Sequence, residues 1–219
     1  MTPPPRTRVK VCGINTPAAM DAAADAGADW VGFVFFPPSP RAVTPAEAAA
    51  LSAHRPGGPL RVGLFVHPTG DDVARALGAV ALDVLQVHDT PDRAAALRAR
   101  FGVPVWQVAS VDGPSDLPAS APGVDGLLLD AKPPPGAALP GGNARVFDWS
   151  VLQGWTAPAP WLLAGGLTPG NVADAVRVSG APAVDVSSGV ERVRGVKDAG
   201  LIRAFVAAAR GQTGSQDGT

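Results

Sequence analysis

The run Trp30-Val-Gly-Phe-Val-Phe35 shows the pattern that decides the fold, because it is apolar at nearly every position. Runs of this kind are typical of strands that are covered on both faces in a parallel sheet. Seven more short runs rich in branched side chains occur along the chain, at 9–12, 61–66, 82–87, 103–108, 124–129, 161–164 and 183–187. The sequence therefore predicts eight parallel strands.

Alanine-rich segments with helical periodicity separate these runs. They lie at 16–26, 45–53, 71–80, 91–101, 169–178 and 198–210. Thr44-Pro45, Thr90-Pro91 and Thr168-Pro169 each predict a hydroxyl N-cap followed by a proline at the first helical position, where its missing N–H costs nothing. Consecutive strands that begin at residues 61, 82 and 103 are 21 residues apart, the length of a minimal βα repeat.

Eight parallel strands, each followed by a helix, can close into a (β/α)8 barrel, and this single-domain α/β fold is the one we predict. An open doubly wound sheet is the main alternative. No Gly-x-Gly-x-x-Gly turn follows the first strand, where the sequence is Cys12-Gly-Ile-Asn-Thr-Pro17, so the dinucleotide-binding form is disfavoured. We expect the barrel at 9–210, a flexible proline-rich N-terminus at 1–8 and a polar disordered tail at 211–219.

Composition limits the classes of function. One cysteine cannot form an internal disulfide, and with only three histidines it makes no metal-binding cluster, so we expect no metal. The 18 basic and 19 acidic residues are spread along the chain, which argues against a nucleic-acid or anionic-lipid surface. We expect no leader peptide or membrane span, because no long apolar segment follows the N-terminal residues or occurs elsewhere in the sequence. We expect a cytoplasmic protein with a small-molecule partner.

Polar residues that end an apolar run are the candidate catalytic groups, because reacting groups of a (β/α)8 barrel lie at the carboxyl ends of its strands. Cys12 ends the first strand and Asp130 follows Leu127-Leu-Leu129. A thiol at the mouth near a cation can act as a base, and a carboxyl group there can act as an acid. The alternatives are a buried structural cysteine and a loop-capping aspartate. Gln86 and His88 can bond a substrate or have a structural role.

Two glycine-rich loops indicate a phosphate site. Ala164-Gly-Gly-Leu-Thr-Pro169 lacks Cβ atoms where a ligand would approach and then opens a helix. Ser187-Ser-Gly-Val-Glu191 supplies hydroxyl groups after the eighth strand. The predicted phosphate-binding residues are Gly165, Gly166, Asp185, Ser187, Ser188 and Gly189. The alternative is that the glycines only form tight turns.

Arg41 lies on a long loop after the second strand, between a proline and a short apolar stretch. Its planar guanidinium can clamp a carboxylate, and the alternative is a solvated surface arginine.

Several motifs, taken in order, resemble those of the phosphoribosylanthranilate isomerase family of tryptophan biosynthesis. They are Lys10-Val-Cys-Gly-Ile14, Ser39-Pro-Arg41, Leu85-Gln-Val-His88, Leu127-Leu-Leu-Asp130 and Asp185-Val-Ser-Ser-Gly-Val-Glu191, and the resemblance runs from about Val9 to Phe205. It implies a (β/α)8 barrel that needs no cofactor. The implied reaction is an Amadori rearrangement of N-(5'-phosphoribosyl)anthranilate to 1-(2-carboxyphenylamino)-1-deoxy-D-ribulose 5-phosphate.

The resemblance also implies roles for individual residues. Asp130 would be the general acid that protonates the ribose ring oxygen, and Cys12 the general base that removes the proton from sugar C2. Arg41 would hold the anthranilate carboxylate, and the two glycine- and serine-containing loops the phosphate. From their position at the end of a strand, we also expect Gln86 and His88 to bind the substrate.

Two positions depart from the family pattern. Asp89 stands where the family usually has glycine, and Asn143 and Ala144 replace a hydroxyl residue and a glycine, which predicts a change in turnover rate. One alternative function is a bifunctional isomerase that also rearranges the histidine-pathway ribotide, a reaction associated with an aspartate pair. The other is a non-catalytic phosphosugar-binding barrel. We expect a monomer or a homodimer.

Overall fold

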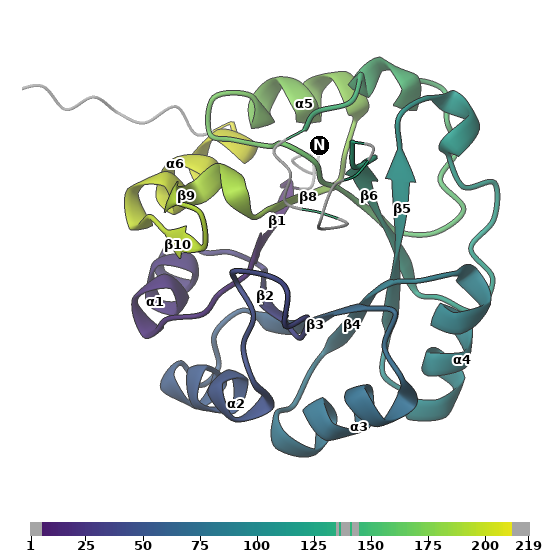
Figure 1. Cartoon of the computed structure of the whole chain (residues 1–219). Helices are drawn as coiled ribbons and strands as arrows, with labels where there is room; N and C mark the ends of the chain where they lie inside the picture. Colours follow the sequence, from purple (N-terminus) through teal and green to yellow (C-terminus); the bar gives the residue numbers. More distant parts are fainter. Residues whose placement is uncertain (1–5, 135, 137–140, 142–144, 212–219) are drawn as a thin grey trace, which may run out of the picture.

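Eight parallel strands close into a barrel in a computed structural model that describes residues 6–134, 136, 141 and 145–211 (Figure 1). The strands are β1 (Arg8–Cys12), β2 (Trp30–Val34), β3 (Leu60–Val66), β4 (Val84–His88), β5 (Val105–Val111), β6 (Gly126–Ala131), β7 (Trp161–Leu163) and β8 (Ala183–Val186). Pairing of β1 with β8, with Lys10 opposite Asp185, completes the ring. The predicted barrel is confirmed, and the open sheet is wrong.

Six α-helices lie around the outside of the barrel in the described part of the chain (Figure 1). They are α1 (Pro17–Asp25), α2 (Pro45–His54), α3 (Gly70–Ala79), α4 (Pro91–Phe101), α5 (Val172–Ser179) and α6 (Ala199–Ala209). The expectation of a helix after every strand is wrong for β5, which is followed by the 3-10 turn η1 (Pro114–Asp116), and within the described residues also for β6, which is followed by η2 (Trp149–Leu152). Both connections are rich in proline, which removes an N–H donor and clashes with the preceding helical turn.

The predicted helix caps have three different outcomes. Thr44 forms a reciprocal capping box, in which its hydroxyl accepts from Glu47 N at 3.2 Å and Glu47 Oε2 accepts from Thr44 N at 2.7 Å. Thr90 occupies the N-cap of α4, but its hydroxyl makes no capping bond, and Asp89 Oδ1 accepts from its N–H at 2.8 Å. The prediction for Thr168 is wrong, because α5 begins only after Asn171, whose Oδ1 accepts from Thr168 N at 2.7 Å.

The inside of the barrel changes character along its axis. One cluster of side chains is apolar and comprises Trp30, Val62, Val84, Trp106, Val108, Leu128, Leu162, Ala164 and Ala183. Trp30 and Trp106 meet edge to face with 5.2 Å between ring centroids, and the Arg8 guanidinium covers Trp30 at 3.7 Å. These aromatic groups lie near the amino ends of the strands and fill that end of the barrel. A cavity can therefore open only at the carboxyl end.

The boundaries predicted for the domain stay a prediction. The first strand begins at Arg8, one residue before the expected barrel, and α6 ends at Ala209. Residues 1–5 and 212–219 of the predicted terminal segments lie outside the described residues. Among the helices that are described, none has both the length and the apolar character that crossing a bilayer requires.

Candidate active site

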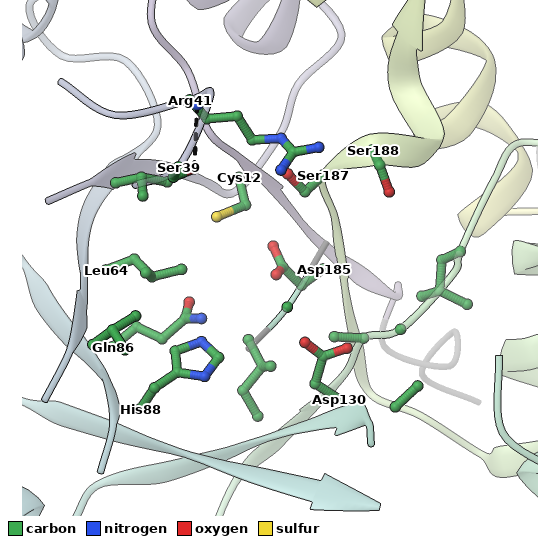
Figure 2. Close-up of a pocket in the computed structure, with 18 of the residues that line it drawn as sticks. Cys12, Ser39, Arg41, Leu64, Gln86, His88, Asp130, Asp185, Ser187 and Ser188 are labelled. Atoms are coloured by element: carbon green, nitrogen blue, oxygen red, sulfur yellow. Dashed lines mark hydrogen bonds between the residues drawn. The ribbon is translucent and has the colours of Figure 1, made fainter. Parts of the chain in front are cut away.

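A cavity of about 840 Å³, counting the solvent at its mouth, opens at the carboxyl ends of the strands (Figure 2). It is lined by every predicted site residue except one: Cys12, Arg41, Gln86, His88, Asp130, Gly165, Gly166, Asp185, Ser187 and Ser188. Gly189 does not line it; this glycine packs against the carbonyl oxygen of Leu167 so closely that a Cβ would overlap that atom.

Alternation along the strands explains why these residues meet. Successive side chains of a strand point to opposite faces, so residues two apart share one face. Cys12 shares the inward face of β1 with Lys10, and His88 shares that of β4 with Gln86. Asp130 reaches the cavity from β6, and Figure 2 shows its carboxyl group and Asp185 on the side facing Gln86 and His88.

The Cys12 thiol is buried, with only 4% of the residue exposed. A Cβ at the facing Gly32 would lie 2.9 Å from Cys12 Sγ and 3.2 Å from Lys10 Nζ, so this glycine provides the space that both side chains occupy. Burial raises the pKa of Cys12, and the positive charges of Lys10 and Lys197 lower it without outweighing burial. The free thiol is therefore mostly protonated at neutral pH.

Asp130 is a buried carboxyl group with a raised pKa. Burial and the negative charge of Asp185 raise the pKa of Asp130 from 3.8 to about 7. Cβ atoms built at Gly141 and Gly165 would lie 2.9 and 3.1 Å from its two carboxyl oxygens, so small residues are needed on both sides. A carboxyl group with this pKa holds a proton for a large part of the time near neutral pH, which suits a general acid.

Gln86 and His88 present neutral hydrogen-bonding groups to the cavity. Burial, together with the charges of Lys10 and His67, lowers the pKa of His88 to about 4, so its imidazole is uncharged at neutral pH. Gln86 is 2% exposed, and its Oε1 has no hydrogen-bond partner among the described residues. Buried polar atoms normally have a partner, so Gln86 Oε1 is an acceptor that a bound ligand can use.

Arg41 is not a surface residue, because it is only 4% exposed. Its Nε and Nη2 donate to the Glu191 carboxylate at 2.6 and 2.9 Å, so one edge of the guanidinium fork is already occupied. Burial opposes ionisation of Glu191, but hydrogen bonds from Arg41 and Lys197 outweigh it and lower the pKa of Glu191 to about 2. The positive charge of Arg41 is thus held in place, with its guanidinium at the cavity (Figure 2).

The loop after β7 needs glycine at two positions. Gly165 and Gly166 have φ angles of +88° and +61°, which side chains rarely adopt. Cβ atoms there would also lie 2.6 Å from Ala131 N and 2.6 Å from Arg145 O. The turn-forming explanation for these glycines is therefore supported, and it does not conflict with phosphate binding, because both residues line the cavity. Ser187 and Ser188 line it from the neighbouring loop after β8 (Figure 2).

Asp185 differs from the other residues predicted to bind phosphate. It lies on β8 and not in the loop, and its Oδ1 accepts from Lys10 Nζ at 2.9 Å inside the barrel. A carboxylate also repels a phosphate dianion. The structure therefore gives Asp185 a different environment from that of Ser187 and Ser188.

Four residues of the site were not singled out from the sequence. Lys10 belongs to the motif Lys10-Val-Cys-Gly-Ile14, and a lysine inside an apolar run is itself a signal of a paired buried charge. Glu191 and Lys197 belong to a hairpin, β9 (Glu191–Val193) and β10 (Val196–Lys197), that the βα pattern did not predict. Arg145 lines the cavity and bonds Asp112 at 2.9 Å.

No three His, Cys, Asp or Glu side chains lie together as metal ligands among the residues that the structure describes. Asn143 and Ala144, for which a change in turnover rate was predicted, lie outside those residues.

Comparisons with known proteins match the chain over most of its length. A family model described as N-(5'phosphoribosyl)anthranilate (PRA) isomerase matches residues 9–208. An N-(5'-phosphoribosyl)anthranilate isomerase of Paramagnetospirillum magneticum is 57% identical over 208 residues, covering 93% of this chain and 97% of the relative. The crystal structure of TrpF from Jonesia denitrificans is 38% identical with a TM-score of 0.80, covering 94% of this chain and 98% of that one.

A second crystal structure is informative because it holds a ligand. It is a phosphoribosyl anthranilate isomerase in complex with reduced 1-(o-carboxyphenylamino)-1-deoxyribulose 5-phosphate. It is 32% identical to this chain with a TM-score of 0.80, and the match covers 94% of this chain and 99% of that one.

Proposed function

The chain belongs to the N-(5'-phosphoribosyl)anthranilate isomerase family, and from this membership we propose how the residues of its barrel mouth divide the reaction. The protein is an isomerase of tryptophan biosynthesis, and it converts N-(5'-phosphoribosyl)anthranilate to the corresponding 1-deoxyribulose 5-phosphate. The observation that carries our assignment is the presence of two titratable groups, Asp130 and Cys12, in one cavity.

Asp130 acts first, as the general acid. Its carboxyl proton moves to the ribose ring oxygen, the C1–O bond breaks, and the nitrogen lone pair forms a C1=N iminium. A proton donor near neutral pH needs a pKa close to the working pH, and the pKa of about 7 at Asp130 meets that requirement. An ordinary exposed aspartate would be ionised and could not donate.

Cys12 acts second, as the general base. Its thiolate takes the proton from sugar C2, and the C–H electron pair forms the C1=C2 bond of an enolamine as the iminium is neutralised. The enolamine then tautomerises to the ketone. The iminium makes the C2 proton acidic, so a thiolate is basic enough for this step.

The remaining residues bind and orient the substrate. Arg41 holds the anthranilate carboxylate through the part of its guanidinium that Glu191 leaves available. Gln86 Oε1 and the neutral His88 bond the polar groups between the two charged ends. Gly165, Gly166, Ser187 and Ser188 hold the phosphate. Gly189 supports that loop by its close packing.

The partner of the protein is thus a small phosphosugar substrate, and none of the assigned steps uses a metal or cofactor. A monomer or a homodimer, and a cytoplasmic location, stay predictions.

A steady-state assay tests the assignment directly. Purified protein should decrease the fluorescence of N-(5'-phosphoribosyl)anthranilate as the substrate is consumed, and the histidine-pathway ribotide serves as the comparison substrate. We expect turnover of the first substrate only, because β1 ends in Cys12 and not in an aspartate. Comparable turnover of both substrates would support the bifunctional alternative, and turnover of neither would support a binding barrel.

The Cys12→Ser variant separates the mechanism from the enzyme class. A serine hydroxyl is a far weaker base than a thiolate near neutral pH, so we expect turnover to fall by about 10²–10⁴. A variant that turns over at the wild-type rate would contradict the role of Cys12 and leave the overall reaction intact.

A further inference from the structure

Lys10 is a fully buried, charged side chain that the proposed steps do not use. It projects into the barrel from β1, two residues before Cys12, and none of its surface is exposed. A buried ammonium group is costly unless it is paired and hydrogen-bonded. Its neighbours Cys12 and Asp185 line the active-site cavity, so the buried charge calls for a role beside them.

Asp185 fixes the position of the Lys10 ammonium. Lys10 Nζ donates to Asp185 Oδ1 at 2.9 Å, a bond between residues 175 positions apart in the chain. Burial lowers the pKa of Lys10, but the negative charges of Asp185 and a Cys12 thiolate outweigh it and raise that pKa above its ordinary value. Lys10 therefore keeps its proton, and it is a fixed positive charge and not a base.

Cys12 Sγ and Lys10 Nζ both lie beside Gly32 on the neighbouring strand β2. Both atoms lie close to the point where Gly32 lacks a Cβ, at 2.9 and 3.2 Å from it. Any side chain on β2 at this position would push the sulfur and the ammonium apart. The close approach of the two groups thus depends on three residues from two neighbouring strands.

The other charged groups around the thiol do not replace Lys10. Asp185 on β8 opposes thiolate formation, whereas Lys197 on β10 favours it less strongly than Lys10 does. Lys197 is also engaged elsewhere, because its Nζ donates to Ser187 O and Glu191 Oε1 at 2.9 and 2.8 Å. Across the cavity, His88 is neutral and Asp130 is partly protonated near neutral pH.

We propose that Lys10 is the positioning residue for the Cys12 base, and that its ammonium, anchored by Asp185, stabilises the thiolate that removes the C2 proton. The inference rests on the proposed role of Cys12. The proton balance is simple, because Sγ gains the C2 proton and Lys10 neither gains nor loses one. In this proposal Asp185 acts through Lys10.

Alkylation by iodoacetamide tests the proposal without substrate, because Cys12 is the single cysteine of the chain. Only the thiolate reacts, so the dependence of the alkylation rate on pH reports the pKa of this thiol. In the Lys10→Met variant we expect the alkylation profile to move to higher pH by about one unit. The rate at pH 7, and kcat/KM for N-(5'-phosphoribosyl)anthranilate, should each fall about tenfold.

A double variant covers the case in which Lys10→Met fails to fold. Lys10→Met with Asp185→Asn removes both charges of the pair, keeps similar side-chain volumes and leaves no unpaired ion. We expect a smaller shift to higher pH, because Lys10 affects the thiol more strongly than Asp185 does. Lys132→Met is the matched control, since Lys132 is 55% exposed and pairs only distantly with Asp116 at 4.0 Å.

An unchanged alkylation profile in both Lys10 variants would overturn the proposal, and a structural role alone predicts that result together with lower thermal stability. The alkylation profile needs no turnover. Failure of the wild-type protein to consume the substrate would instead contradict the proposed function, so the two failures are distinguishable.

Discussion

The two ends of the barrel interior are built on the same strands and the same inward faces, yet they have opposite chemistry. At the amino end, Trp30 and Trp106 pack edge to face inside an apolar cluster. At the carboxyl end, Lys10, Asp185 and Asp130 are ionisable groups with perturbed pKa values. Burial of charge costs stability, whereas burial of aromatic surface contributes to it. One end of this barrel therefore stabilises the fold, and the other is available for catalysis.

The largest expected effect is on turnover, from the Asp130→Asn variant. Asparagine has nearly the same shape but no acidic proton, so kcat should fall by about 10²–10⁴ with the fold retained. Steady-state fluorescence measures the rate, and circular dichroism checks the fold. The exposed Asp92→Asn is the matched control and should keep wild-type turnover. Wild-type turnover by Asp130→Asn would contradict the role of Asp130 as the general acid at the carboxyl end of the barrel.

The Trp106→Ala variant changes the other end of the barrel. It removes one ring of the aromatic pair and leaves a cavity, so the free energy of unfolding should fall by about 3–5 kcal/mol. Denaturant unfolding measures this loss. At a temperature where the variant is folded, kcat should stay within about twofold of the wild type. A large loss of kcat in the folded variant would show that the two ends are not independent.

The dependence of kcat/KM on pH follows from the two catalytic groups. In the proposed mechanism the active form has a proton on Asp130 and none on Cys12, although the pKa of Asp130 is about 7 and burial raises that of Cys12 above its ordinary value. Because the thiol has the higher pKa, most molecules that carry one proton carry it on Cys12, and the active form is a minority of them. We expect kcat/KM to fall about tenfold per pH unit below about pH 7 and to be flat above it until the thiol titrates. A plateau extending to pH 5 would contradict these assignments.

Glu191→Gln should have a smaller effect, on binding. Glutamine can still accept one hydrogen bond, but it no longer holds Arg41 through two charged contacts of 2.6 and 2.9 Å. We expect KM for the substrate to rise roughly tenfold while kcat changes less than about threefold. Glu47→Gln, at the exposed capping box of α2, is a control for the loss of one carboxylate. An unchanged KM would mean that Arg41 is positioned without Glu191.

A further expected effect is on the pH dependence of stability. The pKa of Asp130 is raised from 3.8 to about 7 on folding, so its protonated form favours the folded state. That contribution is complete below about pH 4 and is lost as the pH rises through about 7. Asp130→Asn should therefore raise Tm relative to the wild type at pH 8 more than at pH 4. Thermal unfolding at the two pH values measures this difference, and equal differences would contradict the raised pKa.

The strand predictions, which used the local pattern of apolar residues, agree best with the structure. All eight strands lie where an apolar run predicted them, because the hydrophobic pattern along the chain reports directly which segments are buried. The predicted start of α5 at Pro169 is wrong, because Thr168 N donates to Asn171 Oδ1 and the helix begins only at Val172. The helices expected from regular repetition are also absent after β5 and, in the described residues, after β6, where proline-rich segments form 3-10 turns.

The sequence by itself determined the barrel and, through resemblance, the reaction, because strand periodicity and motif order are local properties. Only the tertiary structure decided that Lys10 meets Asp185, that Glu191 occupies one edge of Arg41, and that the pKa of Asp130 is about 7. Each of these depends on burial and on charges brought together from distant parts of the chain. Electrostatic energy depends on distance and solvent exposure, and neither can be read from the order of residues.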